Sequence, residues 1–200
     1  MPEVSVVMPT YNYGRYIERA IRSVQNQTYR DFEIIVVDDA STDDTPEVVG
    51  KFSEPFIRYI RHTTNRGGNA ARNTGILSAK GAYIALLDSD DDWLPEKLSL
   101  QMEMFAHCPE NVGLIYTGLN VIDVKNIHPP REALPTASGR IFELLLRGNF
   151  ITGGGSSAVV RRSCFEAVGL FDETLPSGQE WEMILRIAKV YEIQFINKAL

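Results

Sequence analysis

The chain reads YIALLDSDD over residues 83–91, where five apolar residues run directly into a cluster of carboxylates. A strand that is apolar at every position, rather than at every second one, is typical of a parallel sheet covered on both faces. Carboxylates this close repel one another unless a cation neutralises them, and Mg²⁺ or Mn²⁺ completes its shell with water and phosphate oxygens. The stretch therefore predicts a buried parallel strand whose acidic end binds a metal-bridged phosphate ligand. A solvated acidic loop that caps the next helix is the alternative.

The same alternation of strand and helix patterns extends over the first 110 residues. Apolar strands are predicted at 4–8, where Pro9 ends the strand, and at 32–37, 57–60 and 83–87, and helical periods follow them at 16–26, 42–52, 70–78 and 95–106. This order predicts an α/β fold with a mainly parallel sheet flanked by helices. In such sheets the ligand binds at the carboxyl ends of the strands, where the connecting loops gather.

The second half of the chain has a looser pattern. It predicts a longer strand at 112–121, a loop at 127–138, a short helix at 141–147, a strand at 158–160, an amphipathic helix at 181–191 and a last strand at 193–196. We expect this half to complete the sheet as a small mixed region and to shape a second pocket, and loops such as 152–157 to contact the sugar. One domain is therefore predicted over residues 1–200, with a first half at 1–110 and a second half at 111–200. A longer parent chain is left open.

Composition restricts the class of protein. Of the 200 residues, 44% are hydrophobic and 23% are charged, which is ordinary for a globular domain. The net charge of −6 disfavours nucleic-acid binding, because proteins that bind a phosphate backbone usually present a basic face. Cys108 and Cys164 lack any Cys-x-x-Cys spacing, so neither a zinc site nor a disulfide framework is predicted.

No targeting or membrane-spanning pattern is visible in the sequence. The chain opens directly into a strand pattern, and no apolar run reaches the roughly 18 residues of a membrane span. We therefore expect a cytoplasmic protein without a membrane span, and peripheral association with the inner face of a membrane is left open.

An acidic pair follows the second predicted strand. Ser41 and Asp44 fit a capping box, and Asp43 and Asp44 suit the start of a helix. Asp38 and Asp39 have no such explanation, and a carboxylate at a strand end can accept a nucleobase N–H or a ribose hydroxyl. One of the two could cap the helix instead, but for Asp39 we favour ligand binding.

A glycine-rich stretch precedes the third predicted helix and reads NRGGNAARNTG over residues 65–75. Glycines let the backbone approach a ligand, and a helix N-terminus with Arg66 or Arg72 offers positive potential near a diphosphate. The stretch matches neither a Walker motif nor a dinucleotide fingerprint. For any single residue, a helix start with a solvated face is an equally good interpretation.

Four stretches, taken in order, resemble the family 2 glycosyltransferases with the GT-A fold. They are VSVVMPTYN at 4–12, DDASTD at 38–43, NAARNTG at 69–75 and LDSDD at 87–91. The resemblance covers nearly the whole chain, and four ordered motifs are far more specific than any one of them. It implies a GT-A domain with a nucleotide-sugar half and an acceptor half.

The resemblance also implies roles for individual residues. Pro9 and Tyr11 would line the base pocket, and Asp39 would accept the uracil N–H. Asp88 would lie near the ribose and a metal-bound water, and Ser89 would lie close to the donor sugar nucleotide. Asp90, together with Asp88, would bind Mn²⁺ or Mg²⁺ under the sugar diphosphate.

A further stretch departs from the family pattern. Family members usually carry Glu-Asp-Trp, in which the Asp is the general base, whereas this chain has Gln179-Glu180-Trp181. Glu180 can perform the same proton transfer if the pocket accommodates one more methylene. Glu180 could instead cap the helix that follows it, and Glu182 is a weaker candidate for the base.

Together these roles predict an inverting, metal-dependent transfer of a sugar from a nucleotide-diphosphate sugar to an acceptor hydroxyl. A UDP-sugar donor, a saccharide or lipid-linked acceptor, and a role in bacterial envelope polysaccharide synthesis are expectations from the family. The processive-synthase signature Gln-x-x-Arg-Trp is absent from the sequence, which favours a non-processive enzyme.

Two other classes of protein stay open. A GT-A domain that binds nucleotide-sugar without turnover is favoured only by the change from Asp to Glu at position 180. A receiver-like signalling domain also has an acidic pair after one strand and an Asp after a later one, as at Asp38, Asp39 and Asp88. A receiver, however, normally begins with the strand that bears the acidic pair, and here a strand and a helix come first.

Overall fold

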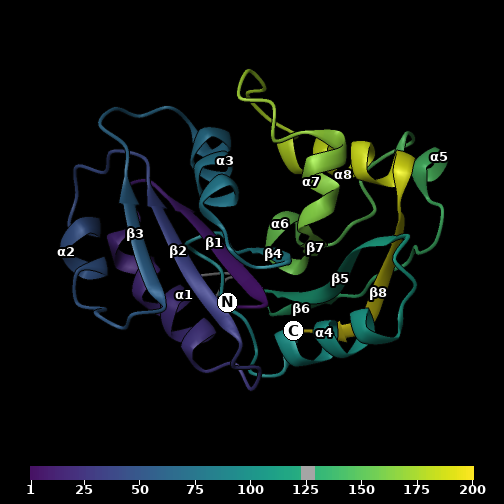
Figure 1. Ribbon diagram of the computed structural model, residues 1–200, viewed down its shortest axis with the longest axis horizontal. Coiled ribbons are helices and arrows are strands. Elements are labelled where there is room, and N and C mark those ends of the chain that lie inside the picture. Colours follow the sequence, from purple (N-terminus) through teal and green to yellow (C-terminus); the bar gives the residue numbers. More distant parts are fainter. Residues whose placement is uncertain (123–128) are drawn as a thin grey trace.

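A single mixed sheet runs through the molecule (Figure 1). The computed structural model describes residues 1–122 and 129–200, and in these residues the sheet has eight strands. The strands are β1 (Val4–Thr10), β2 (Phe32–Asp38), β3 (Ile57–Arg61), β4 (Tyr83–Leu86), β5 (Val112–Val121), β6 (Arg131–Ala133), β7 (Val159–Arg161) and β8 (Glu192–Ala199). Their order is β3-β2-β1-β4-β7-β5-β6, with β8 paired to β5.

Strand direction divides the sheet into a parallel part and a mixed part. The strands β3, β2, β1 and β4 are parallel neighbours. The strand β7 is antiparallel to both β4 and β5, while β8 is parallel to β5 and β6 antiparallel to it. The prediction of a mainly parallel α/β sheet that the second half completes as a mixed region is confirmed.

Helices cover both faces of this sheet (Figure 1). They are α1 (Gly14–Gln25), α2 (Thr45–Val49), α3 (Gly68–Ser78), α4 (Lys97–His107), α5 (Phe142–Leu145), α6 (Gly154–Ser157), α7 (Arg162–Val168) and α8 (Gln179–Val190). The helices α1, α2 and α4 contribute to one hydrophobic cluster, and α7 and α8 contribute to another. In the described part of the chain, no helix has both the length and the apolar character needed to cross a membrane.

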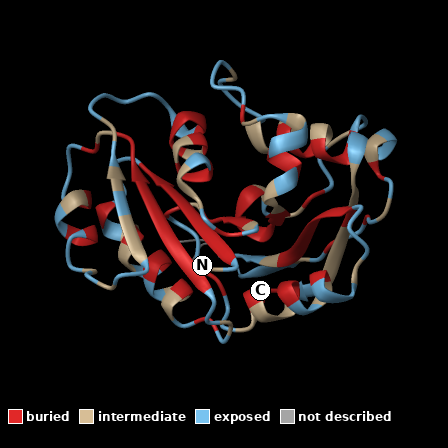
Figure 2. Cartoon of the chain, in the orientation of Figure 1, coloured by how far each residue is buried: buried red, intermediate tan, exposed pale blue. Residues whose placement is uncertain are grey.

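The alternation of side chains along β1 explains how the two faces are filled. Val4, Val6 and Met8 pack into the cluster formed with α1 and α4, while Val7 packs into the opposite cluster. Figure 2 shows β1 and β2 buried along their length, whereas β3 at the edge is only partly buried. The central strands therefore need apolar residues at consecutive positions, as the sequence has them.

The strand β1 continues through Pro9 to Thr10, so the prediction that Pro9 ends it was wrong. The reason is the direction in which Pro9 faces. The carbonyl of Val7 accepts the N–H of Leu87, so the backbone polar groups of Val7 point toward β4. The backbone of Pro9, two residues further along, points to the same side, where β4 has already ended at Leu86. The missing N–H of proline therefore has no strand partner to lose.

The helix predicted at 42–52 is also shorter than expected, and its capping box does not form. The helix α2 begins at Thr45, and its N-cap residue, Asp44, makes no side-chain capping bond. Ser41 instead accepts the N–H of Asn12, whose side chain in turn accepts the N–H of Thr42. Ser41 and Thr42 thus bind the loop after β1, whereas Asp43 accepts the N–H of Thr45, the first residue of α2, at 3.0 Å.

Three elements of the second half were missed. The strand β6 lies inside the predicted loop at 127–138, of which residues 127 and 128 are outside the described residues. The helices α6 and α7 have four and seven residues, too few for a helical period to be recognised. The helix α6 lies within the glycine-rich segment 152–157.

Candidate functional site

A cleft of about 660 Å³ opens at the carboxyl ends of β1, β2 and β4, where the acidic and glycine-rich stretches meet. It is lined by Pro9, Thr10, Tyr11, Tyr13, Asp39, Asn65, Gly67, Gly68, Ala71, Arg72, Asp88, Ser89 and Asp90. Most of the residues predicted to bind a nucleotide-sugar are therefore brought together. The exceptions are Asp38, Arg66 and the predicted base Glu180, which do not line this cleft.

Asp38 is fully buried beneath the turn that follows β2. Its Oδ1 accepts the N–H of Ser41 at 2.8 Å, and its Oδ2 accepts the hydroxyl of Tyr59 and lies 3.6 Å from Nε of Arg61. Burial, followed by the hydrogen bond to Asp38, raises the pKa of the Tyr59 hydroxyl. Asp38 thus stabilises the turn, and the structure shows no contact between it and the cleft.

Arg66 points away from the cleft and pairs with Glu173 at 3.3 Å, with half of its side chain exposed. Its contribution to the site is its backbone. The N–H of Arg66 donates to Oδ1 of Asp39 at 2.8 Å, and the N–H of Gly67 donates to Oδ2 at 2.7 Å. The glycine-rich loop therefore folds around the Asp39 carboxylate before α3 begins.

His62 is a site residue that the sequence analysis missed. Its Nδ1 lies 2.7 Å from Oδ1 of Asp39, and its Nε2 lies 2.9 Å from the hydroxyl of Thr74. A lone histidine carries no motif. The available signal was its position, because it directly follows a predicted parallel strand and so lies at the same sheet edge as Asp39.

Arg72 joins the two halves of the site. Its Nη2 donates to Oδ1 of Asp88 and to Oε1 of Glu180, both at 2.8 Å, and only 11% of its side chain is exposed. Its guanidinium carbon also lies 5.9 Å from the centre of the Phe171 ring. One buried cation thus holds a carboxylate from each half.

Glu180 lies in the first turn of α8 and does not cap the helix. The N-cap residue is Gly178, with φ of 73°, and no side-chain capping bond is present. A Cβ built on Gly154 would stand 3.8 Å from the Glu180 carboxylate, so the side chain lies against the glycines of α6. This distance is an ordinary van der Waals contact, so Glu180 packs against α6 without strain.

The weaker candidate, Glu182, is engaged elsewhere. Both of its carboxylate oxygens accept from Arg186, at 2.6 and 2.8 Å, and Arg186 also donates to the carbonyls of Val168 and Leu170. Glu182 therefore fixes the guanidinium that ties α8 to the end of α7, and Glu180 is the carboxylate that contacts the cleft through Arg72.

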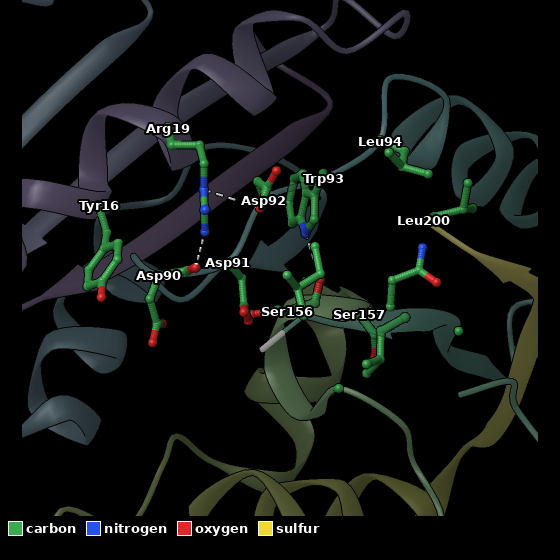
Figure 3. Close-up of a pocket in the computed structure, with 15 residues that line it drawn as sticks. Tyr16, Arg19, Asp90, Asp91, Asp92, Trp93, Leu94, Ser156, Ser157 and Leu200 are labelled. Carbon is green, nitrogen blue, oxygen red and sulfur yellow. Dashed lines mark hydrogen bonds and ion pairs between the residues drawn. The ribbon is translucent and has the colours of Figure 1, made fainter. Parts of the chain in front are cut away.

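The acidic loop after β4 separates the cleft from a second cavity of about 340 Å³, and Asp90 lines both. In Figure 3 the backbone carbonyl of Asp90 is directed toward Arg19, whose Nη2 donates to it at 2.6 Å. The Asp90 side chain points away from Arg19. Gly153, Ser156 and Ser157 of the glycine-rich segment also line this cavity.

The electrostatics of this loop agree with a crowded carboxylate cluster. Burial raises the pKa of Asp91, and the charges of Asp88, Asp90 and Asp92 raise it further, against a hydrogen bond from Ser156. Among the described residues, no three His, Cys, Asp or Glu side chains are grouped as a closed metal site. Asp88 and Asp90 at an open cleft nevertheless fit a hard divalent ion that takes its remaining ligands from water and phosphate.

Comparisons with known proteins agree with this arrangement. The family model described as "Glycosyl transferase family 2" matches residues 5–169. An uncharacterised glycosyltransferase of Rickettsia felis is 34% identical over 206 residues, which cover 100% of this chain and 33% of the relative. The Escherichia coli protein WfgD, named a UDP-Glc:α-D-GlcNAc-diphosphoundecaprenol β-1,3-glucosyltransferase, is 38% identical over 124 residues, 62% of this chain and 48% of that protein.

Solved structures share the fold. Residues 1–349 of TarS from S. aureus superpose with a TM-score of 0.78 at 23% identity, covering 100% of this chain and 59% of that one. The same protein in complex with UDP superposes with a TM-score of 0.75 at 21% identity, covering 98% of this chain and 61% of that one. The mannosyltransferase PcManGT from Pyrobaculum calidifontis was solved in complex with GDP-Man and Mn²⁺. It superposes with a TM-score of 0.74 at 23% identity, covering 98% of this chain and 55% of that one.

The extent of the match differs between the relatives and the family model. The chain spans only about a third of the length of the Rickettsia felis relative. The family model nevertheless matches most of the chain, including the strand ends that form the cleft. The fold is shared with TarS, and by its sequence this chain belongs to glycosyltransferase family 2.

Proposed function

We propose that this chain transfers a single sugar from a UDP-sugar to an acceptor hydroxyl, with inversion at the anomeric carbon. The observation that carries the proposal is the contact of Arg72 with both Asp88 and Glu180, each at 2.8 Å. It sets a candidate general base beside the acidic edge of a cleft large enough for a nucleotide. Family membership favours this class of chemistry over a receiver-like signalling domain, which has no use for Glu180.

The donor would lie across the cleft from β2 to β4. Pro9 and Tyr11 would contact the base, Asp39 would accept its N–H, and Ser89 would lie near the donor. TarS has been solved in complex with UDP on the same fold, which supports a uridine nucleotide here. Asp38, which is fully engaged beneath the cleft, has no place in this proposal.

Asp88 and Asp90 would hold a Mn²⁺ or Mg²⁺ ion at the diphosphate. When bound, such an ion neutralises the charge of the leaving diphosphate. The fold neighbour PcManGT has been solved with Mn²⁺, which supports this choice of cofactor. Arg72 adds a fixed positive charge at the same edge of the cleft.

Glu180 would remove the proton from the acceptor hydroxyl while that oxygen attacks the anomeric carbon. Attack on the face opposite the diphosphate inverts the centre in one displacement. Because Arg72 donates to Oε1, the carboxylate is held in one orientation and its other oxygen is left to face the acceptor.

The acceptor would be a saccharide or a lipid-linked saccharide used in polysaccharide or glycoconjugate synthesis. The printed activity of WfgD, which names a diphosphoundecaprenol-linked acceptor, supports the lipid-linked class. A cytoplasmic location, with peripheral association at the inner face of a membrane, belongs to this part of the proposal.

Calorimetric titration of UDP tests the donor site. We expect wild-type protein to bind UDP with Mn²⁺ or Mg²⁺ and to lose most of that affinity in EDTA. Asp90→Ala should behave like wild type in EDTA whether or not the metal is present. Asp92→Ala is the matched control, because Asp92 pairs with Arg19 at 3.3 Å and does not line the cleft. Absence of UDP binding by folded wild-type protein under every condition would overturn the assignment.

A domain that binds the nucleotide-sugar without turnover is the second candidate. The observation that favours it is glutamate at position 180, where the family usually has aspartate. The two candidates differ in what Glu180 does, and the Glu180 variants described in the Discussion separate them.

A further inference from the structure

The carboxylate of Asp39 is nearly saturated with hydrogen bonds before any ligand arrives. An ionised carboxylate has about four lone-pair positions and accepts only. Oδ1 accepts the N–H of Arg66 and the Nδ1–H of His62, while Oδ2 accepts the N–H of Gly67. Three positions are thus taken by the protein, and the one that is left lies on Oδ2.

The proton positions around His62 follow from its neighbours. Because Asp39 only accepts, Nδ1 of His62 must carry the proton in the 2.7 Å contact. In the neutral ring, Nε2 then accepts the hydroxyl proton of Thr74 at 2.9 Å. With 7% of its side chain exposed, His62 has little freedom to rotate out of this arrangement.

This geometry bears on the base that the cleft can accept. The imide edge of uracil offers one N–H, so it needs one acceptor. The Watson–Crick edge of guanine offers N1–H and the N2 amino group side by side, and it pairs best with both oxygens of a carboxylate. Asp39 can serve the first pattern but not the second while His62 donates to Oδ1.

We propose that His62 is a positioning residue that selects uracil over guanine by occupying Oδ1 of Asp39. The inference rests on the proposed function, because it takes the cleft to bind a nucleoside diphosphate with the base at Asp39. His62 does not line the cleft itself and acts through Asp39. Of the three donors to Asp39 in the described residues, His62 is the side chain, so it is the one that substitution can remove.

The test compares UDP and GDP, which differ in the base and share the ribose and the diphosphate. Dissociation constants are measured with Mn²⁺ for wild type, His62→Phe and His62→Gln. We expect wild type to bind UDP at least tenfold more tightly than GDP, and His62→Phe to reduce this ratio about tenfold, or about 1.4 kcal/mol. His62→Gln, whose amide can donate to Oδ1 again, should restore much of the ratio.

Tyr59→Phe is the control for a merely structural effect. It removes the hydroxyl that binds Asp38, the neighbour of Asp39, without touching the cleft or His62. We expect it to lower the melting temperature and to leave the UDP-to-GDP ratio unchanged. Melting curves of all variants establish that each is folded at the temperature of the titration.

Several outcomes would overturn the inference. An unchanged ratio in folded His62→Phe would show that His62 does not select the base, although UDP binding would keep the proposed function intact. An equal loss of ratio in Tyr59→Phe would assign the effect to general loosening. A wild-type protein that prefers GDP would contradict the count of one free acceptor position on Asp39. Wild type that binds neither nucleotide would instead overturn the proposed function, and with it this inference.

Discussion

At the scale of single residues, Arg72 has the most constrained environment in the site. It is almost buried, it pairs with Asp88 and Glu180, and its Nε has no acceptor among the described residues. Both carboxylates are contacted by one nitrogen, Nη2, while the guanidinium carbon lies 5.9 Å from the centre of the Phe171 ring. Arg72, one of the two arginines that the sequence offered for the diphosphate, therefore also contacts the candidate base.

Glu180→Gln tests the role of that base. Glutamine keeps the shape and can still contact Arg72, but it cannot take a proton, so transfer should fall by a factor of about 10²–10⁴. The dissociation constant of UDP should stay within about threefold of wild type. Turnover of a UDP-sugar and calorimetry of UDP measure the two quantities separately. Unchanged transfer in Glu180→Gln would remove Glu180 from the mechanism.

Glu180→Asp is the companion variant, because it restores the residue that the family usually carries. If the glycines of α6 are matched to the longer side chain, Glu180→Asp should retain less transfer than wild type and more than Glu180→Gln. Equal loss in both variants would mean that the length of the side chain matters as much as its charge.

Lys97 is an ionisable residue of the core whose burial disfavours a positive charge. It is fully buried, its Nζ donates to Gln101 at 2.8 Å and lies 4.1 Å from the Trp93 ring centre, and no ion pair involves it among the described residues. Burial lowers the pKa of Lys97 well below its ordinary value. The unfolded chain therefore binds a proton that the folded protein does not, over the range between the lowered and the ordinary pKa.

The sign of the pH dependence follows. In that range the free energy of unfolding should rise with pH, because protonation favours the unfolded state, and the contribution is lost as the pH falls. Lys97→Met should remove this rise at pH values below about 10, the ordinary pKa of a lysine. Urea unfolding at several pH values measures it, with the exposed Lys51→Met as control. Parallel curves for wild type and Lys97→Met would contradict a neutral buried lysine.

At the scale of elements, α3 carries most of the construction of the site. Its first turn lines the cleft with Gly68, Ala71 and Arg72. Further along, Gly75 lets the helix approach β1 so closely that a Cβ would stand 2.2 Å from Cγ1 of Val7. The NAARNTG stretch thus combines residues that contact the ligand side with residues that set the distance between helix and sheet.

Gly75→Ala should therefore destabilise the protein, although alanine favours helices by about 1 kcal/mol over glycine. Overpacking typically costs about 1–3 kcal/mol, and a contact of 2.2 Å with a branched, buried side chain lies at the severe end. Chemical denaturation measures the net loss. The control is Leu77→Ala on the exposed face of α3, which we expect to change stability by about 0.5 kcal/mol or less. A stabilised Gly75→Ala would show that α3 can move away from β1 freely.

The elements also show where reading the sequence succeeded and where it failed. Long apolar strands and the helices α1, α3, α4 and α8 were predicted nearly in place, because burial of a regular face leaves a period in the sequence. The prediction of a capping box at Ser41 and Asp44 was wrong, because Asn12, about 30 residues away in the chain, binds Ser41 and the N–H of Thr42 instead. Local pattern cannot reveal a partner that only the fold brings near.

At the scale of the whole molecule, one sheet crosses the boundary between the two predicted halves. The strand β4 of the first half pairs with β7 of the second. Asn73 on α3 adds a polar link, since its side chain donates to the carbonyl of Phe171 at 2.9 Å and accepts the N–H of Phe171 at 2.9 Å. These contacts support the prediction of one domain over residues 1–200, which remains a prediction.

Unfolding of Asn73→Ala tests that prediction. The variant leaves two buried backbone groups of Phe171 without partners, and each unsatisfied group costs about 1–3 kcal/mol. If the halves form one domain, we expect one transition, shifted to lower temperature and seen equally by near- and far-ultraviolet circular dichroism. Asn111→Ala, at an exposed contact with Glu192, is the control. Two separate transitions in the variant would mean that the halves fold independently.

The sequence by itself determined the α/β class, the family and most of the residues of the cleft, because consecutive residues at strand ends carry both the burial pattern and the polar groups. Only the tertiary structure decided which carboxylates face the cleft. It buried Asp38 in contact with Tyr59 of β3, brought His62 to Asp39, and placed Glu180 against Arg72 across 108 positions of sequence. The physical reason is that each of these choices depends on a hydrogen-bond partner from another element, and such a partner leaves no mark on the local sequence.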